Sequence, residues 1–207
     1  MYAKNRTKLQ SMTQTKRLEI VLGLNLSMVA GLVIVGLSSH SLGVLAAGGD
    51  YIADSTAIAL GLIAIYVRDR SKSKSKATTI VAAINAGFLL VVTAIVSVEA
   101  IRRLFGNSPE IHGLPVLIIS AIATIVMVIG AVILAGDNQE DDIHMRSVVL
   151  DTISDAVSAG AVAITGAIIF FAKGLYWLDS AVALAVSIII IYQALKLLRD
   201  VVTDLKT

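Results

Sequence analysis

The chain has 207 residues, of which 57% are hydrophobic and only 15% charged, and its mean hydropathy is +0.85. A soluble domain carries roughly 25% charged residues, so the composition indicates an integral membrane protein and leaves no room for a soluble domain. The formal charge of +2 is too small to suggest a nucleic-acid partner, and the absence of cysteine excludes disulfides and thiolate metal sites.

Six apolar segments have the length of a membrane-spanning helix, which needs roughly 20 apolar residues. They predict an all-α membrane protein with six transmembrane helices, at Ile20–Leu37, Val44–Val67, Thr79–Ile101, Leu114–Ala135, Val148–Ala172 and Tyr176–Leu198. The first segment follows a basic stretch and lacks a small-residue cleavage site, so it is expected to be a helix and not a signal peptide. The expected domains are an N-terminal arm (1–19), a transport domain (20–198) and a short tail (199–207) without a soluble C-terminal domain.

The placement of basic residues predicts the orientation in the membrane. Of the 17 Lys and Arg residues, all except Arg102, Arg103 and Lys173 fall in the N-terminal arm, in the second and fourth loops, or in the tail and the end of the sixth segment just before it. Cytoplasmic loops carry an excess of Lys and Arg. Both termini are therefore predicted to be cytoplasmic. The protein is expected to be a multi-pass protein of the cell membrane.

Two pairs of aspartates lie inside predicted membrane helices. Asp50 and Asp54 lie in the second segment, and Asp151 and Asp155 lie in the fifth. The Asp-x-x-x-Asp spacing puts both carboxylates of a pair on one helix face, about one turn apart. Ionised carboxylates are expensive in a bilayer, and like charges at this spacing repel, so a divalent cation or protonation must compensate them.

The topology predicts that the two pairs meet. The second and fifth segments run in opposite directions, and both pairs fall near the middle of the membrane. The fifth segment adds a polar stripe at helical spacing, which is expected to face the protein interior, formed by Ser147, Asp151, Ser154, Asp155 and Ser158. Gly48 and Gly49 precede the first pair and should allow a neighbouring helix to approach closely.

The paired motif resembles that of the cation diffusion facilitator family of metal–proton antiporters. The stretch from Leu45 to Asp54 looks like the family's second-helix motif, and Leu150–Asp155 looks like its fifth-helix counterpart. Supporting stretches are Ala82–Ala86, Glu99–Leu104, Pro109–Ile111 and Leu178-Asp179. The resemblance covers nearly the whole chain, and the two motifs together in a six-helix frame are fairly specific.

The resemblance implies that Asp50, Asp54, Asp151 and Asp155 form a tetrahedral transport site. It further implies export of a cytoplasmic divalent transition metal in exchange for protons, by alternating access, usually in a homodimer. Zinc transporters of the family usually have a histidine in one or both pairs, and oxygen-only ligands favour harder ions such as Mn²⁺. The surrounding sequence looks closer to exporters of Zn²⁺ and Cd²⁺, so these ions are favoured and Mn²⁺ stays open. No permanent cofactor is expected.

Other polar residues suggest weaker roles. His144, beside Asp141 and Asp142, could collect metal at the cytoplasmic mouth, although a flexible solvated loop is the favoured interpretation. His40 could assist metal or proton release on the other side or be an interfacial bystander. Asp179 is expected to complement the dipole of the helix that it opens.

Two other classes of protein compete with a transporter: intramembrane enzymes and cation channels. A metal-dependent phosphatidyl transferase also has Asp-x-x-x-Asp on a membrane helix, but needs an additional upstream Asp-x-x-Asp-Gly that this chain lacks. Intramembrane aspartyl proteases need one aspartate on each of two helices, not two pairs. A cation channel would differ from an antiporter in having no dependence on a proton gradient.

Overall fold

The computed structural model describes residues 14–68, 75–135 and 143–206, and all the secondary structure in these ranges is helical. The helices are α2 (Gln14–Ser38), α3 (Leu42–Arg68), α4 (Ser75–Phe105), α5 (Gly113–Ala135), α6 (Ile143–Ala172) and α7 (Trp177–Lys206). Each coincides with one predicted membrane segment, the sixth of which begins one residue before α7, and this confirms the all-α, six-helix prediction. The residues predicted to be a tail, from Arg199 on, continue α7 as far as Lys206.

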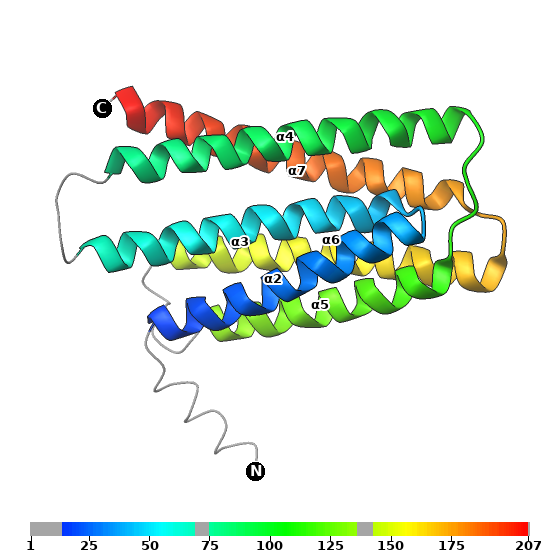
Figure 1. The fold of residues 1–207 in the computed structure, drawn as a ribbon, viewed down its shortest axis with the longest axis horizontal. Helices are drawn as coiled ribbons and strands as arrows, with labels where there is room; N and C mark the ends of the chain where they lie inside the picture. Colours follow the sequence, from blue (N-terminus) through cyan, green and yellow to red (C-terminus); the bar gives the residue numbers. More distant parts are fainter. Residues whose placement is uncertain (1–13, 69–74, 136–142, 207) are drawn as a thin grey trace, which may run out of the picture.

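Within these ranges, five helices are long and apolar enough to cross a membrane. The spans are Thr15–Ser38, Ala83–Phe105, Gly113–Ile133, Thr152–Ala172 and Trp177–Arg199. The helix without such a span is α3, whose mean hydropathy is lowered by Asp50 and Asp54. It has 27 residues and packs against α2, α4, α6 and α7 (Figure 1). The protein is therefore an integral membrane domain in which the helix that carries Asp50 and Asp54 packs against several of its neighbours.

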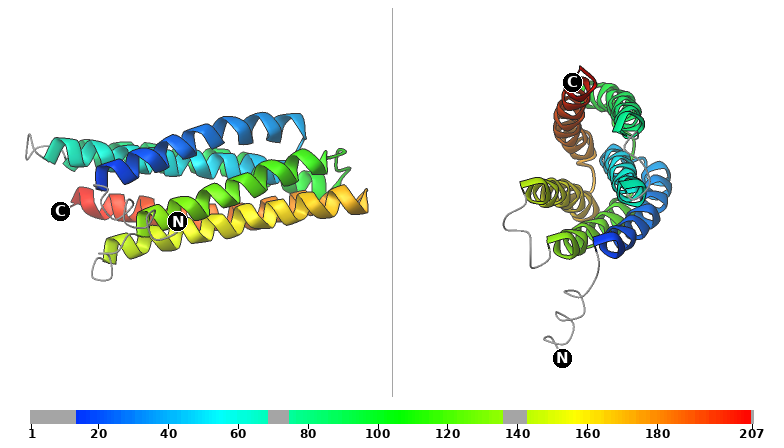
Figure 2. Two further views of the ribbon diagram at one scale, coloured as in Figure 1. Left: turned by 90° about the horizontal axis from the view of Figure 1, so that it is seen from below. Right: turned by 90° about the vertical axis from the view of Figure 1, so that its left-hand side faces the viewer.

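The helices run roughly along one axis, with all three described helix connections at one end (Figure 1). We call this end, where α2 joins α3, α4 joins α5 and α6 joins α7, the turn end. The opposite end, where α2 begins and α7 stops, is the terminal end. Seen along the axis, α4 and α7 form a pair, and α3 lies between this pair and the group of α2, α5 and α6 (Figure 2).

The core is divided in the same way. The first cluster of buried apolar side chains joins α2, α3, α5 and α6, and includes Leu32, Val44, Tyr51, Val116, Met127 and Val162. The second joins α3 to the α4–α7 pair, and includes Leu42, Ala46, Leu89, Val96, Val186 and Ile190. Because α3 contributes buried residues to both clusters, it connects the group of α2, α5 and α6 to the α4–α7 pair.

Close helix contacts depend on glycine at α5 and α6. A Cβ atom at Gly166 would lie 2.6 Å from the backbone nitrogen of Leu117, and one at Gly113 would lie 2.6 Å from that of Phe170. The predicted close approach at Gly48 is also present, since a Cβ there would lie 3.4 Å from Cβ of Leu32. The tightest approach in the described residues is thus between α5 and α6, and not at the glycines that precede Asp50.

A three-residue turn joins α2 to α3. His40 has a positive φ of 57°, a region in which histidine is several-fold enriched among non-glycine residues. The Ser41 N–H donates to the Gly36 carbonyl (3.0 Å) and the His40 N–H to that of Leu37 (3.4 Å). This is the Schellman pattern of a helix C-terminus, so α2 ends with its last carbonyls satisfied.

Candidate functional site

A cavity of about 340 Å³ lies between α3 and the α4–α7 pair. Its acidic lining residues are Asp50 and Asp54 on α3 and Asp155 on α6. Its other lining residues are Ala53, Ala57, Asn85, Ala86, Leu89, Tyr192, Gln193, Ala194, Lys196 and Leu197. The α7 contributors come from the second half of that helix, so the cavity lies toward the terminal end.

The three aspartates are held inside the bundle. Asp50 is 8% exposed and Asp155 is 5% exposed, while Asp54 is half-buried. Ser158, one turn beyond Asp155, is also buried, as expected for the polar stripe of this helix. Three carboxylates around one cavity inside a membrane domain are costly unless they share protons or face a cation, and the basic residue among the lining side chains is Lys196.

Two hydrogen bonds fix the rotation of α3 about its own axis, and therefore the direction in which its aspartates face. The Tyr51 hydroxyl donates to the Ala123 carbonyl of α5 at 2.6 Å, and the side chain is only 1% exposed. On the cavity side, the Asn85 side-chain amide of α4 donates to the Ala53 carbonyl at 3.3 Å. Asn85 is therefore a link between helices, as buried polar side chains in membrane proteins commonly are, and it also lines the cavity. Together the two bonds keep Asp50 and Asp54 turned toward α4 and α7.

The fourth predicted ligand lies on the same helix as Asp155. Asp151 is one turn before it in α6, but its side chain is outside the described set. Among the side chains that the structure does describe, no three His, Asp or Glu residues are arranged so that they could hold a metal ion. The tetrahedral set of four aspartates therefore stays a prediction.

The accessory residues predicted near the cytoplasmic mouth are largely outside the described residues. Asp141 and Asp142 fall in the gap before α6, and His144 lies in the first turn of α6 with its side chain not described. Their role in collecting metal stays a prediction.

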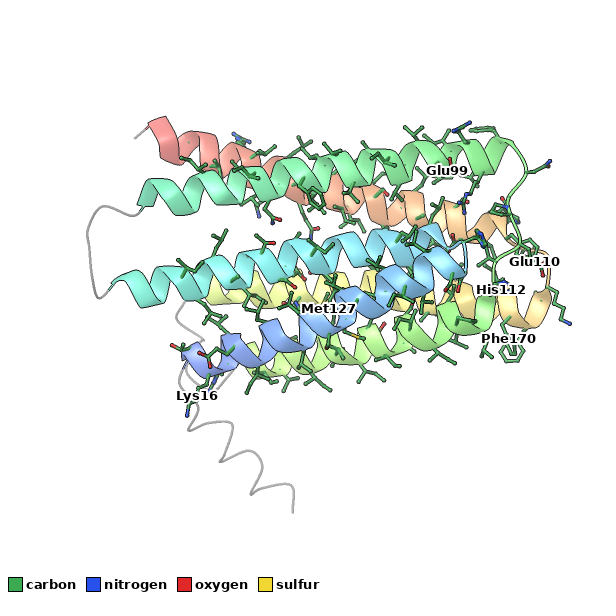
Figure 3. The ribbon with its side chains drawn as sticks, viewed as in Figure 1. Lys16, Glu99, Glu110, His112, Met127 and Phe170 are labelled. Carbon is green, nitrogen blue, oxygen red and sulfur yellow. The ribbon has the colours of Figure 1, made fainter. Side chains whose placement is uncertain are left out.

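The residues at the turn end are remote from the cavity. His40 is exposed in the α2–α3 turn, where its carbonyl accepts a 2.6 Å bond from Arg103. Glu110 and His112 lie at the same end, near Phe170, while Lys16 is at the other (Figure 3). Glu110 and His112 line a separate hollow of about 400 Å³ together with Lys173. Neither histidine shares a cavity with the described aspartates.

Sequence reasoning missed part of the cavity wall. Tyr192, Gln193 and Lys196 lie on α7 and line the cavity, although nothing in their spacing distinguishes them from an ordinary helix end. The available signal for the cavity wall was that Tyr192 and Gln193, two adjacent polar residues, lie near the end of the sixth apolar segment. Their place beside Asp54 follows only from the packing of α7 against α3 and α4.

The fold and the cavity define a class of protein: a multi-helix membrane domain with acidic residues gathered around an internal cavity. Comparison with known families identifies the particular one. Residues 18–206 match the cation efflux transmembrane domain, so the chain belongs to the cation efflux family. This confirms the family resemblance of the aspartate motifs and supports a transporter over an intramembrane enzyme.

Curated relatives are distant but cover most of the chain. It is 29% identical over 195 residues to the zinc transporter ZitB of Yersinia pestis, covering 91% of this chain and 62% of that protein. It is 27% identical over 192 residues to the cadmium, cobalt and zinc/H(+)-K(+) antiporter of Bacillus subtilis, covering 87% of this chain and 61% of that protein. It is 26% identical over 191 residues to the metal cation efflux system protein CzcD of Cupriavidus metallidurans, covering 89% of this chain and 60% of that protein. The chain thus spans less than two thirds of the length of these relatives.

Proposed function

We propose that this domain exports divalent transition-metal cations, Zn²⁺ and Cd²⁺ in the first place, in exchange for protons. Asp50, Asp54, Asp151 and Asp155 are the proposed ligands. The observation that supports this most directly is the convergence of three of these carboxylates, from α3 and α6, on one cavity. The relatives whose names specify zinc, cadmium and cobalt support the choice of ion.

The proposed cycle uses the charge of the aspartates alone. A divalent cation enters from the terminal end, which the basic residues predict to be cytoplasmic, and neutralises the ionised carboxylates. When the cavity opens to the other side, protons replace the metal on the same oxygens and the cation leaves. The protonated site then returns, so that the carboxylates never cross the membrane uncompensated. The homodimer implied by the family resemblance is a further part of the proposal.

The Mn²⁺ alternative rests on the donor set. All four proposed ligands are carboxylates, and oxygen donors suit harder cations better than a site that includes histidine does. A Mn²⁺ preference would therefore follow if the ligands alone decided selectivity. The experiment below ranks the three ions directly.

The test is metal flux into proteoliposomes with an imposed pH gradient, comparing Zn²⁺, Cd²⁺ and Mn²⁺. We expect gradient-dependent flux in the parent and flux at background level in Asp155→Ala. The matched control is Glu110→Gln, which removes an exposed carboxylate remote from the cavity and should transport normally. Normal flux in folded Asp155→Ala would refute the site, and flux that ignores the pH gradient would indicate a channel.

A further inference from the structure

Asp179, at the start of α7, is a fully buried carboxylate that the proposed transport cycle does not use. Its exposure is 0%, and it lies at the turn end of the bundle. Instead of serving only the helix to which it belongs, it binds the first turn of α3. Oδ2 accepts a 2.7 Å bond from the Leu42 N–H, Oδ1 accepts a 2.5 Å bond from the Ser41 hydroxyl, and both oxygens lie 3.4 Å from the Gly43 nitrogen.

The first four N–H groups of any α-helix have no partner within the helix, and in α3 all four are accounted for. The Val44 N–H donates to the Ser41 hydroxyl oxygen at 3.2 Å, and the Ser41 N–H donates to the Gly36 carbonyl at 3.0 Å. Ser41 is thus an ordinary N-cap, and the remaining two donors, at Leu42 and Gly43, are satisfied by Asp179. Because α3 has its own cap, the distinctive effect of Asp179 is to join α3 to α7.

A second charged side chain joins the same turn to the other helix of the pair. Arg103, near the end of α4, donates to the His40 carbonyl at 2.6 Å and to Glu99 at 3.1 Å. Its charge also lies close enough to Asp179 to interact with it. Both helices of the α4–α7 pair therefore hold the α2–α3 turn, each through one charged residue, at the end of the bundle away from the cavity.

We call the contact of Asp179 with Ser41 and Leu42 the joint. It links α3 and α7, two of the helices that line the cavity. Asp50 lies about 12 Å along α3 from Leu42, and Tyr192 lies about 20 Å along α7 from Asp179, at the helical rise of 1.5 Å per residue. A rotation or slip of α3 against α7 at the joint is carried along both rods to the aspartates.

We propose that Asp179 is a positioning residue for transport: its carboxylate holds the start of α3 against α7, so that α3 moves against α7 about one fixed point and its aspartates keep their axial register with the cavity wall of α7. The part of this proposal that concerns transport rests on the proposed function. The register itself does not, and it can be measured separately.

The chain has no cysteine, so spin labels attach only to cysteines that are introduced at chosen positions. Labels at Ile63 on α3 and Leu195 on α7, both exposed and both beyond the joint, report the register of the two helices by electron spin resonance distance measurement. We expect one narrow distance distribution in the metal-free parent and a clearly broader one in Asp179→Asn, which removes the charge and places an N–H donor against the donors of α3.

Ser180→Ala is the matched control, because it removes the neighbouring, equally buried hydroxyl, which has no hydrogen-bond partner among the described residues. It should leave the distribution unchanged. Metal flux per folded molecule, measured well below each variant's melting temperature, should fall at least tenfold in Asp179→Asn and stay within twofold of the parent in Ser180→Ala. A role in stability alone would lower the melting temperature without either change.

A distance distribution in Asp179→Asn as narrow as in the parent would overturn the proposal, and so would parental flux in a variant with a broadened distribution. If Asp179→Asn does not fold, Ser41→Ala removes one bond to the carboxylate and should broaden the distribution by a smaller amount; no broadening overturns the proposal. Normal flux in Asp155→Ala would instead refute the metal site, while leaving the distance measurement as a valid test of the joint.

Discussion

Replacing Gly166 by alanine should separate α6 from α5 and thereby displace Asp155. The added Cβ would lie 2.6 Å from the Leu117 nitrogen, 2.8 Å from a Val116 methyl and 3.0 Å from the Leu117 Cα. Favourable contacts of carbon atoms lie at roughly 3.5–4.0 Å, so the helices must move apart by about 1 Å. The contacted atoms are mainly backbone, which cannot swing aside as the end of a flexible side chain does.

The expected loss of stability can be worked from this geometry. Overpacking a well-packed core costs about 1–3 kcal/mol, and contact with backbone places this site near the upper value. Alanine recovers about 1 kcal/mol relative to glycine through helix propensity. The net loss is about 2 kcal/mol, which corresponds to a melting temperature about 4–8 °C lower for a domain of this size.

Gly160→Ala is the control on the same helix. A Cβ there meets nothing closer than a Thr124 methyl at 3.9 Å, so only the gain in helix propensity remains, and the melting temperature should stay equal or rise. The assay is thermal unfolding in one detergent, followed by metal flux, which should fall in Gly166→Ala and stay normal in Gly160→Ala. If Gly166→Ala melts as high as Gly160→Ala, the reasoning from close helix contact is wrong.

Two further substitutions test the interior of the bundle. Tyr51→Phe removes the hydroxyl that donates to Ala123 and should cost about 1 kcal/mol, seen as a melting temperature about 2–4 °C lower and a modest loss of flux as α3 gains rotational freedom; an unchanged melting temperature would contradict this. Ser187→Ala on α7 removes a fully buried hydroxyl for which the described residues provide no hydrogen-bond partner. It should keep or raise the melting temperature, because an unsatisfied buried polar group costs roughly 1–3 kcal/mol; a clear decrease would show that the hydroxyl has a partner.

The positions of the helices could be predicted because they depend on local sequence. A run of apolar residues of bilayer length is a strong signal, and each of the six predicted segments lies within one helix or ends within a residue of it. The shared face of Asp50 and Asp54 was predictable for the same reason, since a spacing of four depends only on helix geometry. The polar stripe of α6 is confirmed as far as Asp155 and Ser158, which are both buried.

Contacts between distant parts of the chain could not be predicted in the same way. Asp179 lies 138 residues from Ser41 in the sequence, and its position in the first turn of α7 suggested a local role with that helix's own dipole. The structure instead directs its carboxylate to α3. The Tyr51 bond to Ala123 and the close contact at Gly166 likewise depend on which helices are neighbours, which hydropathy does not specify.

The continuity of α7 has a mechanical consequence. This helix runs without a break from Trp177, beside the joint with α3, along the cavity wall at Tyr192–Leu197, and on to Lys206. An unbroken helix transmits a push or a twist along its length, because bending it sharply requires a proline, a glycine–serine pair or an inserted group. A partner that binds the last turns of α7 would therefore move the α7 wall of the aspartate cavity relative to the fixed contact at Asp179.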